Sequence, residues 1–375
     1  MAERESTVEG VGVIRAHFAG VPELVTGHTG FKGSWLSLWL HRLGAKVSGF
    51  ALAPPTDPSN FVVSGVQNLL AHHIEADVRD RGAVRAAITK VQPRVVFHMA
   101  AQPLVRESYR EPLETFGTNV MGTATVLDAV RERGAPCVVI VVTSDKCYEN
   151  QEHVWGYREI DPMGGHDPYS ASKGAAELVT SAYRKSFFPV ASLEQHGIAV
   201  ASARAGNVIG GGDWAKDRLM VDAILALQQN VAVQIRNPTA VRPWQHVLEP
   251  LSGYLLLAAR MLERRDPSIC SAWNFGPVAG DCLPVQSIVE QACRAWGDGR
   301  WDARVSSAAP HEAGMLRLNI DKAQSFLQWQ PRWRVHEAVQ RTVAWYRAFY
   351  AAPQTSMASR CLADIAAYEE AASPA

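Results

Sequence analysis

The sequence has no excess of charge of either sign, because 37 lysine and arginine residues balance 37 aspartate and glutamate residues. It contains no dense run of basic residues, which argues against a nucleic acid as partner and leaves any phosphate to be held by local groups. Its most apolar stretch, around residues 254–259, is too short to span a membrane. The first ten residues carry acidic side chains without an apolar run, so we expect neither a secretory signal nor a membrane partner.

Cysteine is scarce, with six residues in 375, and the cysteines are scattered without the paired spacing of metal ligands. In a chain of this length such cysteines are typical of reduced thiols. We therefore expect a cytoplasmic protein with no bound metal. Cys147 lies close in sequence to the residues discussed below as catalytic, but we interpret it as a small packing residue.

Apolar segments alternate with helical patterns through the first 205 residues. Residues 138–143 (VVIVVT) are strongly β-branched and apolar and show no alternation with polar residues. This is typical of a parallel strand covered on both sides. The alternation predicts an α/β fold with a doubly wound parallel sheet of the Rossmann type. Strands are expected at 24–26, 46–52, 94–99, 138–143 and 198–204, and helices at 34–43, 81–90, 112–133 and 169–185.

A glycine-rich segment, residues 27–33 (GHTGFKG), lies between the first strand and the first helix. Gly27 permits a tight turn, Gly30 lets the backbone approach a pyrophosphate, and Gly33 lets the helix pack closely on the strand. The start of the helix then offers free N–H groups to the phosphates. A glycine-rich turn without a ligand is the alternative, and the flanking strand and helix disfavour it. The expected cofactor contacts in this loop are Gly27, Thr29, Gly30, Phe31, Lys32 and Gly33.

The acidic residue that usually binds the adenosine ribose after the second strand is not obvious, since that strand ends at Leu52 and Asp57 comes late. Asp77 and Val78 are expected to contact the adenine edge. No arginine directly follows the strand to bind a 2′-phosphate, which favours NAD over NADP.

Tyr169 and Lys173 are spaced to share one face of a helix. A free tyrosine has a pKa near ~10 and is a poor base at neutral pH. A neighbouring lysine and a positively charged nicotinamide favour the phenolate, which can then accept a proton from a hydroxyl. This spacing alone is common on amphipathic helices, so it needs support from elsewhere in the chain.

That support comes from Ser144, Asp145 and Lys146, which follow the strand at 138–143. Ligands bind at the carboxyl ends of strands in open α/β sheets. Ser144 can hydrogen-bond the same substrate hydroxyl as Tyr169, and two titratable groups stand beside it. The alternative is an exposed polar turn.

Two further polar residues have less certain roles. Asn119, within the helix at 112–133, is expected to bond the backbone or water near the site, with an ordinary polar helix position as the alternative. His98 precedes the segment Ala100-Ala101-Gln102, and we interpret it as a hydrogen-bonded core histidine and not as a base.

From about residue 20 to about residue 335 the chain resembles the extended short-chain dehydrogenase/reductase family, because these motifs stand in the family's order. Within it the chain is most similar to CDP-glucose 4,6-dehydratases. Four segments carry this likeness: residues 26–35, 143–150, 204–214 and 242–247. Other dehydratases carry Asp-Glu where this chain has Asp145-Lys146. Further departures are Pro22 and Glu23 in the first strand and Gln328 where glycine is common.

The resemblance implies NAD as cofactor and a sugar nucleotide, preferably CDP-glucose, as substrate. The implied reaction is a 4,6-dehydration to CDP-4-keto-6-deoxyglucose and water, with internal hydride transfer through NAD. It also implies a homodimer formed through the helices at 112–133 and 169–185. The implied cofactor contacts are Ala100, Ala101, Gln102, Asn119, Tyr169 and Lys173, and the implied substrate contacts are Gln102, Asn207 and Arg242.

The same resemblance implies a role for each of the five catalytic residues. Tyr169 takes the proton of the C4 hydroxyl, Ser144 orients that hydroxyl, and Lys173 holds the nicotinamide ribose. Asp145 then gives a proton to the leaving C6 hydroxyl, and Lys146 is the candidate base for the C5 proton.

We expect a Rossmann domain that binds NAD and carries the catalytic residues at 18–205. A mainly substrate-binding lobe, some of whose segments return to the sheet, is expected at 206–350, with tails at 1–17 and 351–375. Two other functions remain open. One is a sugar-nucleotide 4-epimerase or reductase, which would have no use for Asp145, and the other is a non-catalytic dinucleotide-binding protein.

Overall fold

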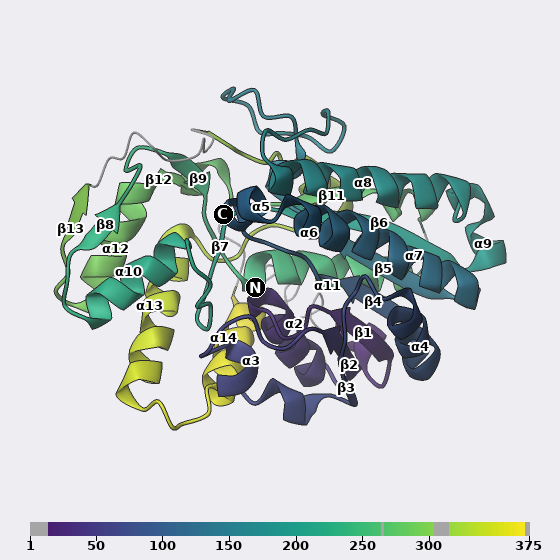
Figure 1. Cartoon of the computed structure of the whole chain (residues 1–375), viewed down its shortest axis with the longest axis horizontal. Coiled ribbons are helices and arrows are strands. Elements are labelled where there is room, and N and C mark those ends of the chain that lie inside the picture. The colour runs from purple at the N-terminus through teal and green to yellow at the C-terminus, as the bar shows by residue number, and fades with distance from the viewer. Residues whose placement is uncertain (1–13, 264–265, 304–314, 372–375) are drawn as a thin grey trace, which may run out of the picture.

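A computed structural model describes residues 14–263, 266–303 and 315–371. Within these residues seven strands form one sheet, in the order β11-β6-β5-β4-β1-β2-β3, and every neighbouring pair is parallel (Figure 1). The strands are β1 (Pro22–Thr26), β2 (Lys46–Ala51), β3 (His72–Glu75), β4 (Val95–His98), β5 (Cys137–Val142), β6 (Ile198–Ala205) and β11 (Ala272–Phe275).

The strand order reverses between β1 and β4, which lie side by side at the centre of the sheet. In doubly wound sheets, ligands bind outside the carboxyl ends of the strands at such a reversal. The glycine-rich segment follows β1, and the segment Ala100-Ala101-Gln102 follows β4. The expected α/β fold is therefore confirmed, and it brings two of the predicted motifs together at one edge.

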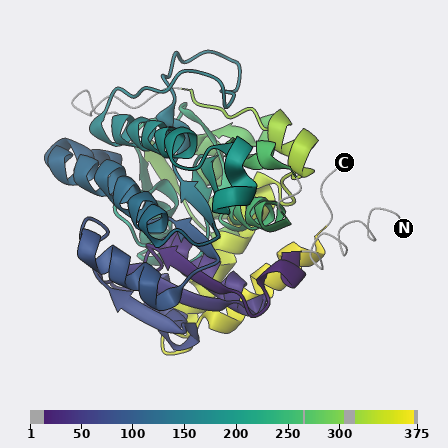
Figure 2. The same cartoon turned by 90° about the vertical axis from the view of Figure 1, so that its right-hand side faces the viewer.

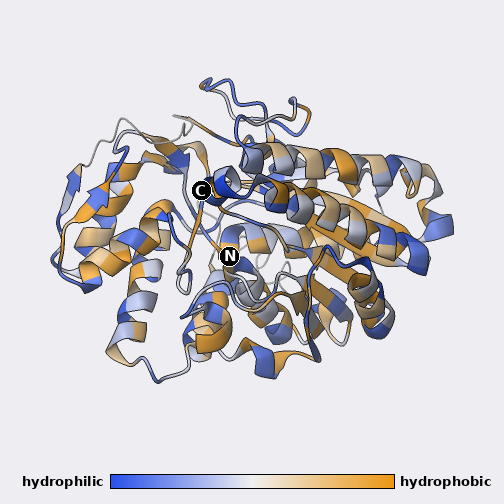
Figure 3. Ribbon diagram, viewed as in Figure 1, coloured by the Kyte–Doolittle hydropathy of each residue, from blue (hydrophilic) through white to orange (hydrophobic). Residues whose placement is uncertain are grey.

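Helices cover both faces of the sheet (Figure 2). One face carries α4 (Arg81–Val91), α7 (Gly122–Arg133) and α8 (Pro168–Ser186), whose apolar sides pack on β1, β4 and β5. The other carries α2 (Phe31–Arg42) and α11 (Leu248–Glu263). Hydrophobic residues accordingly concentrate along the strands and on the inner sides of the helices (Figure 3). Such two-sided cover explains why β5 is buried along most of its length.

The helix expected at 112–133 is a continuous helical path in three parts. It begins as α6 (Pro112–Phe116), widens into the π-helical turn η2 (Gly117–Met121) and continues as α7. Short π-helical turns of this kind frequently occur at functional sites. Here the turn contains Asn119, whose side chain is buried.

The chain after residue 205 contributes to the sheet as well as to a smaller lobe. Strand β11 extends the sheet beyond β6, and α11 covers the sheet face beside α2. The lobe has its own small core between α10 and α12. Its elements are β7 (Val208–Ile209), α10 (Leu219–Gln228), β8 (Val233–Ile235), β9 (Val241–Pro243), β10 (Gln245–His246), β12 (Cys282–Pro284), α12 (Val285–Trp296) and β13 (Trp301–Ala303).

The segment that the sequence sets apart as a tail, residues 351–375, contains a packed helix. This helix, α14 (Ala358–Glu370), follows α13 (Val335–Ala351) and lies against α2. Glu369 accepts hydrogen bonds from the Trp39 indole and the Arg42 guanidinium at 2.9 Å each. The expected leader at 1–17 lies mostly outside the described residues.

Several short elements connect the main ones, and among the described helices none has the length and apolar character needed to cross a membrane. The short elements are α3 (Asn60–Val63), η1 (Val66–Leu69), α5 (Val105–Arg110), η3 (Asp145–Cys147), η4 (Val190–Ser192), α9 (Leu193–His196), η5 (Pro267–Ile269), η6 (Ala279–Asp281) and η7 (Ala323–Leu327).

Candidate active site

The glycine-rich loop is folded so tightly that two of its glycines admit no side chain. A Cβ on Gly33 would lie 2.1 Å from the Gly27 carbonyl oxygen. A Cβ on Gly27, which has a φ of +76°, would lie 2.8 Å from the backbone nitrogen of Ala100. The loop leads directly into the N-terminus of α2, whose first N–H groups have no partner within the helix. This geometry suits a cradle for the negatively charged phosphates of a ligand.

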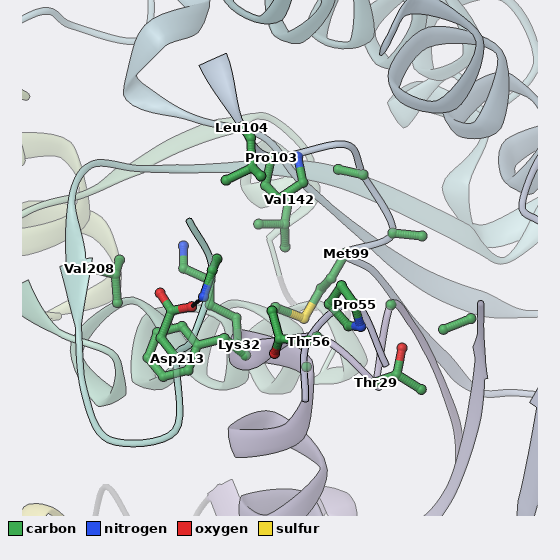
Figure 4. Close-up of a pocket in the computed structure, with 18 of the residues that line it drawn as sticks. Thr29, Lys32, Pro55, Thr56, Met99, Pro103, Leu104, Val142, Val208 and Asp213 are labelled. Atoms are coloured by element: carbon green, nitrogen blue, oxygen red, sulfur yellow. Dashed lines mark hydrogen bonds between the residues drawn. The ribbon is translucent and has the colours of Figure 1, made fainter. Parts of the chain in front are cut away.

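A cavity of about 880 Å³ opens above this loop (Figure 4). Its volume lies in the range of small-molecule and cofactor sites. Thr29 and Lys32 lie on one side of the cavity and Val142 on the other. Ten of the predicted cofactor contacts outside the catalytic helix line it: Gly27, Thr29, Gly30, Phe31, Lys32, Gly33, Asp77, Val78, Ala100 and Ala101.

Gln102 and Asn119 do not line this cavity but hold one of its walls. The Asn119 Oδ1 accepts from the Gln102 backbone N–H at 2.8 Å, and the Asn119 Nδ2 donates to the Ser172 hydroxyl at 2.8 Å. The Gln102 amide bonds the Leu104 backbone and the Thr115 hydroxyl. The side chain of Gln102 therefore makes its hydrogen bonds to the segment 104–115 beside it. Asn119 links Gln102 by hydrogen bonds to the helix that carries Tyr169.

Part of the cavity is bounded by a segment that the sequence did not predict as a binding segment. Residues 51–60, between β2 and α3, line it, and the Thr29 hydroxyl donates to the Leu52 carbonyl at 2.9 Å. Asp77 also lines the cavity, and the hydrogen-bonded Arg79 guanidinium holds the pKa of Asp77 below its usual value. The polar residues that follow β2 after a short interval, Thr56 and Asp57, are the signal in the sequence that could have indicated this segment.

Lys32 places a positive charge within the cavity wall. Burial lowers the pKa of Lys32 to about 7, and the charges of Arg218 and Lys173 act in the same direction, whereas Asp145 opposes them. The Lys32 ammonium lies 6.0 Å from the centre of the Tyr254 ring. A group that changes its charge near neutral pH thus lines the cavity.

The predicted catalytic turn follows β5 at the carboxyl edge of the sheet. The Ser144 hydroxyl donates to Asp145 Oδ1 at 3.0 Å, and the Lys146 ammonium lies 3.6 Å from the same oxygen. Asp145 is buried, and its Oδ2 has no hydrogen-bond partner among the described residues. The turn therefore presents a hydroxyl, a buried carboxyl group and a partly exposed amine to one cavity.

Tyr169 and Lys173 line the same cavity from α8 and are both buried. Burial lowers the pKa of Lys173 to about 8. Burial raises the pKa of Tyr169, and the opposite effect expected from Lys173 together with a bound nicotinamide stays a prediction. The Ser144 hydroxyl and the Arg218 charge oppose the rise without cancelling it. A positive charge bound beside the Tyr169 ring would favour the phenolate, which is the form that can act as a base.

His98 and Cys147 have the packing roles that the sequence suggested. His98 is buried, its ring nitrogens bond Thr26 at 2.8 Å and Thr123 at 3.1 Å, and burial lowers its pKa to about 3. The side chain of Cys147 is fully buried, and burial raises the pKa of its thiol. The residues described contain no group of three histidine, cysteine or acidic side chains placed to hold a metal ion.

A second cavity of about 610 Å³ continues from the first and shares Lys146 and Asn207 with it. Arg242 lines this second cavity, and its guanidinium donates to the Val241 carbonyl at 3.0 Å. Arg218 stands between the two cavities and lines both. Sequence reasoning missed Arg218, although it follows the glycine-rich segment 210–212 by a few residues.

The strand order, the glycine cradle after β1 and the serine, tyrosine and lysine at the carboxyl edge define a protein of the short-chain dehydrogenase class. The family model described as GDP-mannose 4,6 dehydratase matches residues 24–342, and the chain belongs to this family. The resemblance stated from the sequence is thereby confirmed.

Curated relatives include a CDP-glucose 4,6-dehydratase of Salmonella typhimurium, 53% identical over 87% of this chain and 90% of the relative. A CDP-paratose 2-epimerase of Salmonella typhi is 24% identical over 86% of this chain and 98% of the relative. Among solved structures, a dTDP-glucose 4,6-dehydratase of Bacillus anthracis in complex with NAD has a TM-score of 0.72 and 20% identity, covering 87% of this chain and 96% of its own. A UDP-glucose 4-epimerase of Thermotoga maritima has a TM-score of 0.73 and 21% identity, covering 88% and 99%. These distant structures support the fold.

Proposed function

We propose that this chain is an NAD-dependent 4,6-dehydratase that converts CDP-glucose into CDP-4-keto-6-deoxyglucose and water. The observation that carries the proposal is the 53% identity to a CDP-glucose 4,6-dehydratase over most of both chains. The site supports it, because Asp145 and Lys146 stand beside the Ser144–Tyr169 pair in one cavity. An epimerase would use the pair but would have no task for an acid at Asp145.

The cavity above the glycine loop suits NAD. Gly27 and Gly33 leave room only for backbone at the place where a pyrophosphate would approach, and α2 begins there. Lys173 is placed to hold the nicotinamide ribose, and Thr29, Asp77 and Val78 line the part of the cavity that would take adenosine. When bound, NAD supplies the chemistry of accepting a hydride from the sugar and returning it.

The first proton transfer falls to Tyr169 and Ser144. The Tyr169 phenol takes the proton of the C4 hydroxyl, and the Ser144 hydroxyl orients that group. Because burial raises the pKa of Tyr169, the proton leaves the substrate only when nearby positive charges stabilise the phenolate. The charge of Arg218 lowers the pKa of Tyr169, and Lys173 lines the same cavity from the same helix.

The loss of water falls to Asp145 and Lys146. A ketone at C4 acidifies the C5 proton, which the amine of Lys146 removes. The buried Asp145 side chain gives a proton to the leaving C6 hydroxyl, and Lys146 later returns a proton to C5. The proton that Tyr169 takes from C4 balances the one that Asp145 gives up, so the net loss is one water.

The substrate's nucleotide is proposed to lie in the second cavity. Asn207 lines both cavities and suits a phosphate or sugar oxygen at their junction. Arg242 suits the diphosphate, since a guanidinium can bond two oxygens at once. Gln102, whose side chain is used within its own loop, supports the wall between these groups.

The deciding experiment incubates the pure protein with CDP-glucose and a catalytic amount of NAD and follows the sugar nucleotide by mass. Loss of one water, with no accumulation of reduced cofactor, is expected. Water loss only from GDP-, dTDP- or UDP-glucose would keep the dehydratase reaction but assign a different nucleobase to the substrate. An isomer of unchanged mass would indicate an epimerase, and no reaction with any of the four would contradict a catalytic role.

We further propose a homodimer in the cytoplasm. Exposed apolar side chains lie on the two neighbouring helical segments expected at the interface, with Leu113 85% and Met121 60% exposed on α6 and η2 and Leu178 61% exposed on α8. The six cysteines, all of them among the described residues, form no disulfide, which suits a reducing compartment. Light scattering is expected to give twice the chain mass, and Leu113→Glu with Leu178→Glu is expected to give a monomer.

A further inference from the structure

Two buried and oppositely charged side chains lie directly behind the catalytic turn, and none of the steps above uses them. Glu177 is on α8 and Arg204 is on β6, each side chain is 4% exposed, and the guanidinium lies 2.7 Å from Glu177 Oε2. Burial alone would raise the pKa of Glu177, but Arg204 and two hydroxyl donors hold it below its usual value. Both groups are therefore charged. Because such pairs often stabilise a fold no more than apolar residues would, their presence here needs another explanation.

Glu177 joins the start of the catalytic turn to the catalytic helix. The Thr143 hydroxyl donates to Glu177 Oε1 at 2.5 Å, and the Ser202 hydroxyl donates to Oε2 at 2.7 Å. Thr143 immediately precedes Ser144, and Glu177 follows Lys173 by about one helical turn. One carboxylate therefore fixes β5, β6 and α8 relative to one another just below the reacting groups.

Arg204 holds the other end of the same turn. Its Nη1 donates to the Tyr148 hydroxyl at 2.7 Å, and its guanidinium lies 4.9 Å from the centre of the Tyr148 ring. Tyr148 follows Cys147 at the end of the turn, and its hydroxyl in turn donates to Asn274 on β11. Arg204 also stands two residues before Gly206, which contacts Asp145.

We propose that the Glu177–Arg204 pair is a positioning device for the dehydration, which fixes both ends of the turn at residues 144–147 against the helix that carries Tyr169 and Lys173. The proposal rests on the function proposed above. Neither residue lines the two cavities, so both act through the residues that they hold. A displacement of reacting groups by about 1 Å can lower a rate on the order of 100-fold.

Glu177 also acts on the charge of Lys173. Burial lowers the pKa of Lys173 to about 8, while Cys147 on the turn and Glu177 on the same helix raise it. The other ionisable groups around it are Lys32 on α2, His98 on β4 and Tyr169 on α8. Without the charge of Glu177, Lys173 would lose its proton at a lower pH, so the alkaline fall of the activity would move towards acid.

The test compares the wild type with the double variant Glu177→Gln/Arg204→Met in the full chain. This variant leaves no unpaired buried charge, and the glutamine can still bond Thr143 and Ser202. We expect kcat for CDP-glucose to fall on the order of 100-fold. We expect KM and the dissociation constant for NAD to change less than about threefold, and the alkaline limb of kcat to move towards acid.

A matched control replaces another ion pair with a buried acidic member, Arg341–Asp364, which joins α13 to α14 and lines neither cavity. Arg341→Met/Asp364→Asn is expected to lower the melting temperature and to leave kcat and its pH limb unchanged. A second variant, Arg204→Lys, keeps the charge opposite Glu177 but cannot bond Tyr148 with the same planar fork. It is expected to give an intermediate kcat, and it decides the question if the double variant does not fold.

The inference is overturned if the folded double variant keeps kcat within about twofold of the wild type, if its pH limb does not move, or if the control loses as much kcat. It is likewise overturned if Arg204→Lys is fully active. If the wild type releases no water from any sugar nucleotide, the proposed function fails and this inference fails with it. If the wild type releases water and the double variant is unaffected, this inference fails while the proposed function stands.

Discussion

The carboxyl group of Asp145 lies so close to Gly206 that a side chain at position 206 would have to displace it. A Cβ at position 206 would come within 2.9 Å of Asp145 Oδ2 and 2.8 Å of the Pro243 ring. Gly206 directly precedes Asn207, which lines both cavities. The segment that is proposed to hold the substrate thus also sets the place of the proposed acid.

Replacing Gly206 with alanine is expected to displace Asp145 and to lower kcat for water loss by about 10- to 100-fold, because the acid no longer reaches the C6 hydroxyl. NAD binding should change little, since the contact lies away from the glycine loop. Isotope exchange at C5 and product mass would be measured together. Gly82→Ala on α4, remote from both cavities, serves as control, and equal losses in the two variants would contradict this role.

Tyr169→Phe is expected to lower kcat by about 100- to 10,000-fold with little change in substrate affinity, because it removes the only proposed acceptor of the C4 hydroxyl proton. Steady-state kinetics and substrate binding by calorimetry would separate the two effects. A variant that retained more than a tenth of the wild-type kcat would assign that proton to another group.

Lys146→Ala is expected to stop the exchange of the C5 proton with solvent deuterium, because the variant lacks the proposed amine base. Product mass and the deuterium content at C5 would be measured in heavy water. Normal exchange in the variant would remove Lys146 from this role, whereas lost exchange with retained binding of CDP-glucose would support it.

Glu249, at the start of α11, makes the stability of the fold depend on pH. Burial raises its pKa to about 7, although the Tyr368 hydroxyl and the backbone N–H groups of Arg332 and Trp333 oppose the rise. Its stabilising contribution is therefore full below the unfolded value of 4.5 and is lost as the pH rises through about 7. Relative to Glu249→Gln, the wild-type free energy of unfolding should fall by about 3 kcal/mol between these limits. Urea unfolding of both proteins at several pH values measures this difference, and parallel curves would contradict it.

Glu23 is a second buried carboxyl group, placed in β1 between Val47 and Val95 of the neighbouring strands. Neither of its carboxyl oxygens has a partner among the described residues, and burial raises its pKa well above the usual value. Glu23→Leu is therefore expected to stabilise the protein by about 1–3 kcal/mol at pH 8 and by less at pH 5. Chemical unfolding at both pH values tests this expectation, with Glu23→Gln as control, and a destabilised leucine variant would contradict it.

Local sequence predicts the sheet best where burial is complete on both faces. Residues 138–142 are all apolar, and β5 forms there within one residue of the expected bounds. β11 gave no such signal, because its four residues include a polar asparagine and they pair only with β6. The π-helical turn at Asn119 was equally invisible, since its helical periodicity differs little from that of the flanking turns.

For the site, motifs predict which residues meet but not how each is oriented or charged. The glycine loop, the turn after β5 and the catalytic helix meet as expected at one cavity. The Gln102 amide points towards Thr115, and the pKa of Tyr169 is raised by burial. Both depend on residues that are distant in the sequence. Arg204 lies 27 residues beyond its partner Glu177, on a different element, so no local pattern connects the two.

The return of the chain to the sheet at β11 has a consequence for synthesis. A nascent chain that has emerged only as far as β6 still lacks both its last strand and α11, the helix that covers the sheet beside α2. An unpaired strand edge and an apolar sheet face therefore remain exposed to other chains until about 70 further residues leave the ribosome, at ≈ 5–20 residues per second. The interval of greatest risk of aggregation comes late in translation, and chaperones that shield apolar surface would act on the chain during that time.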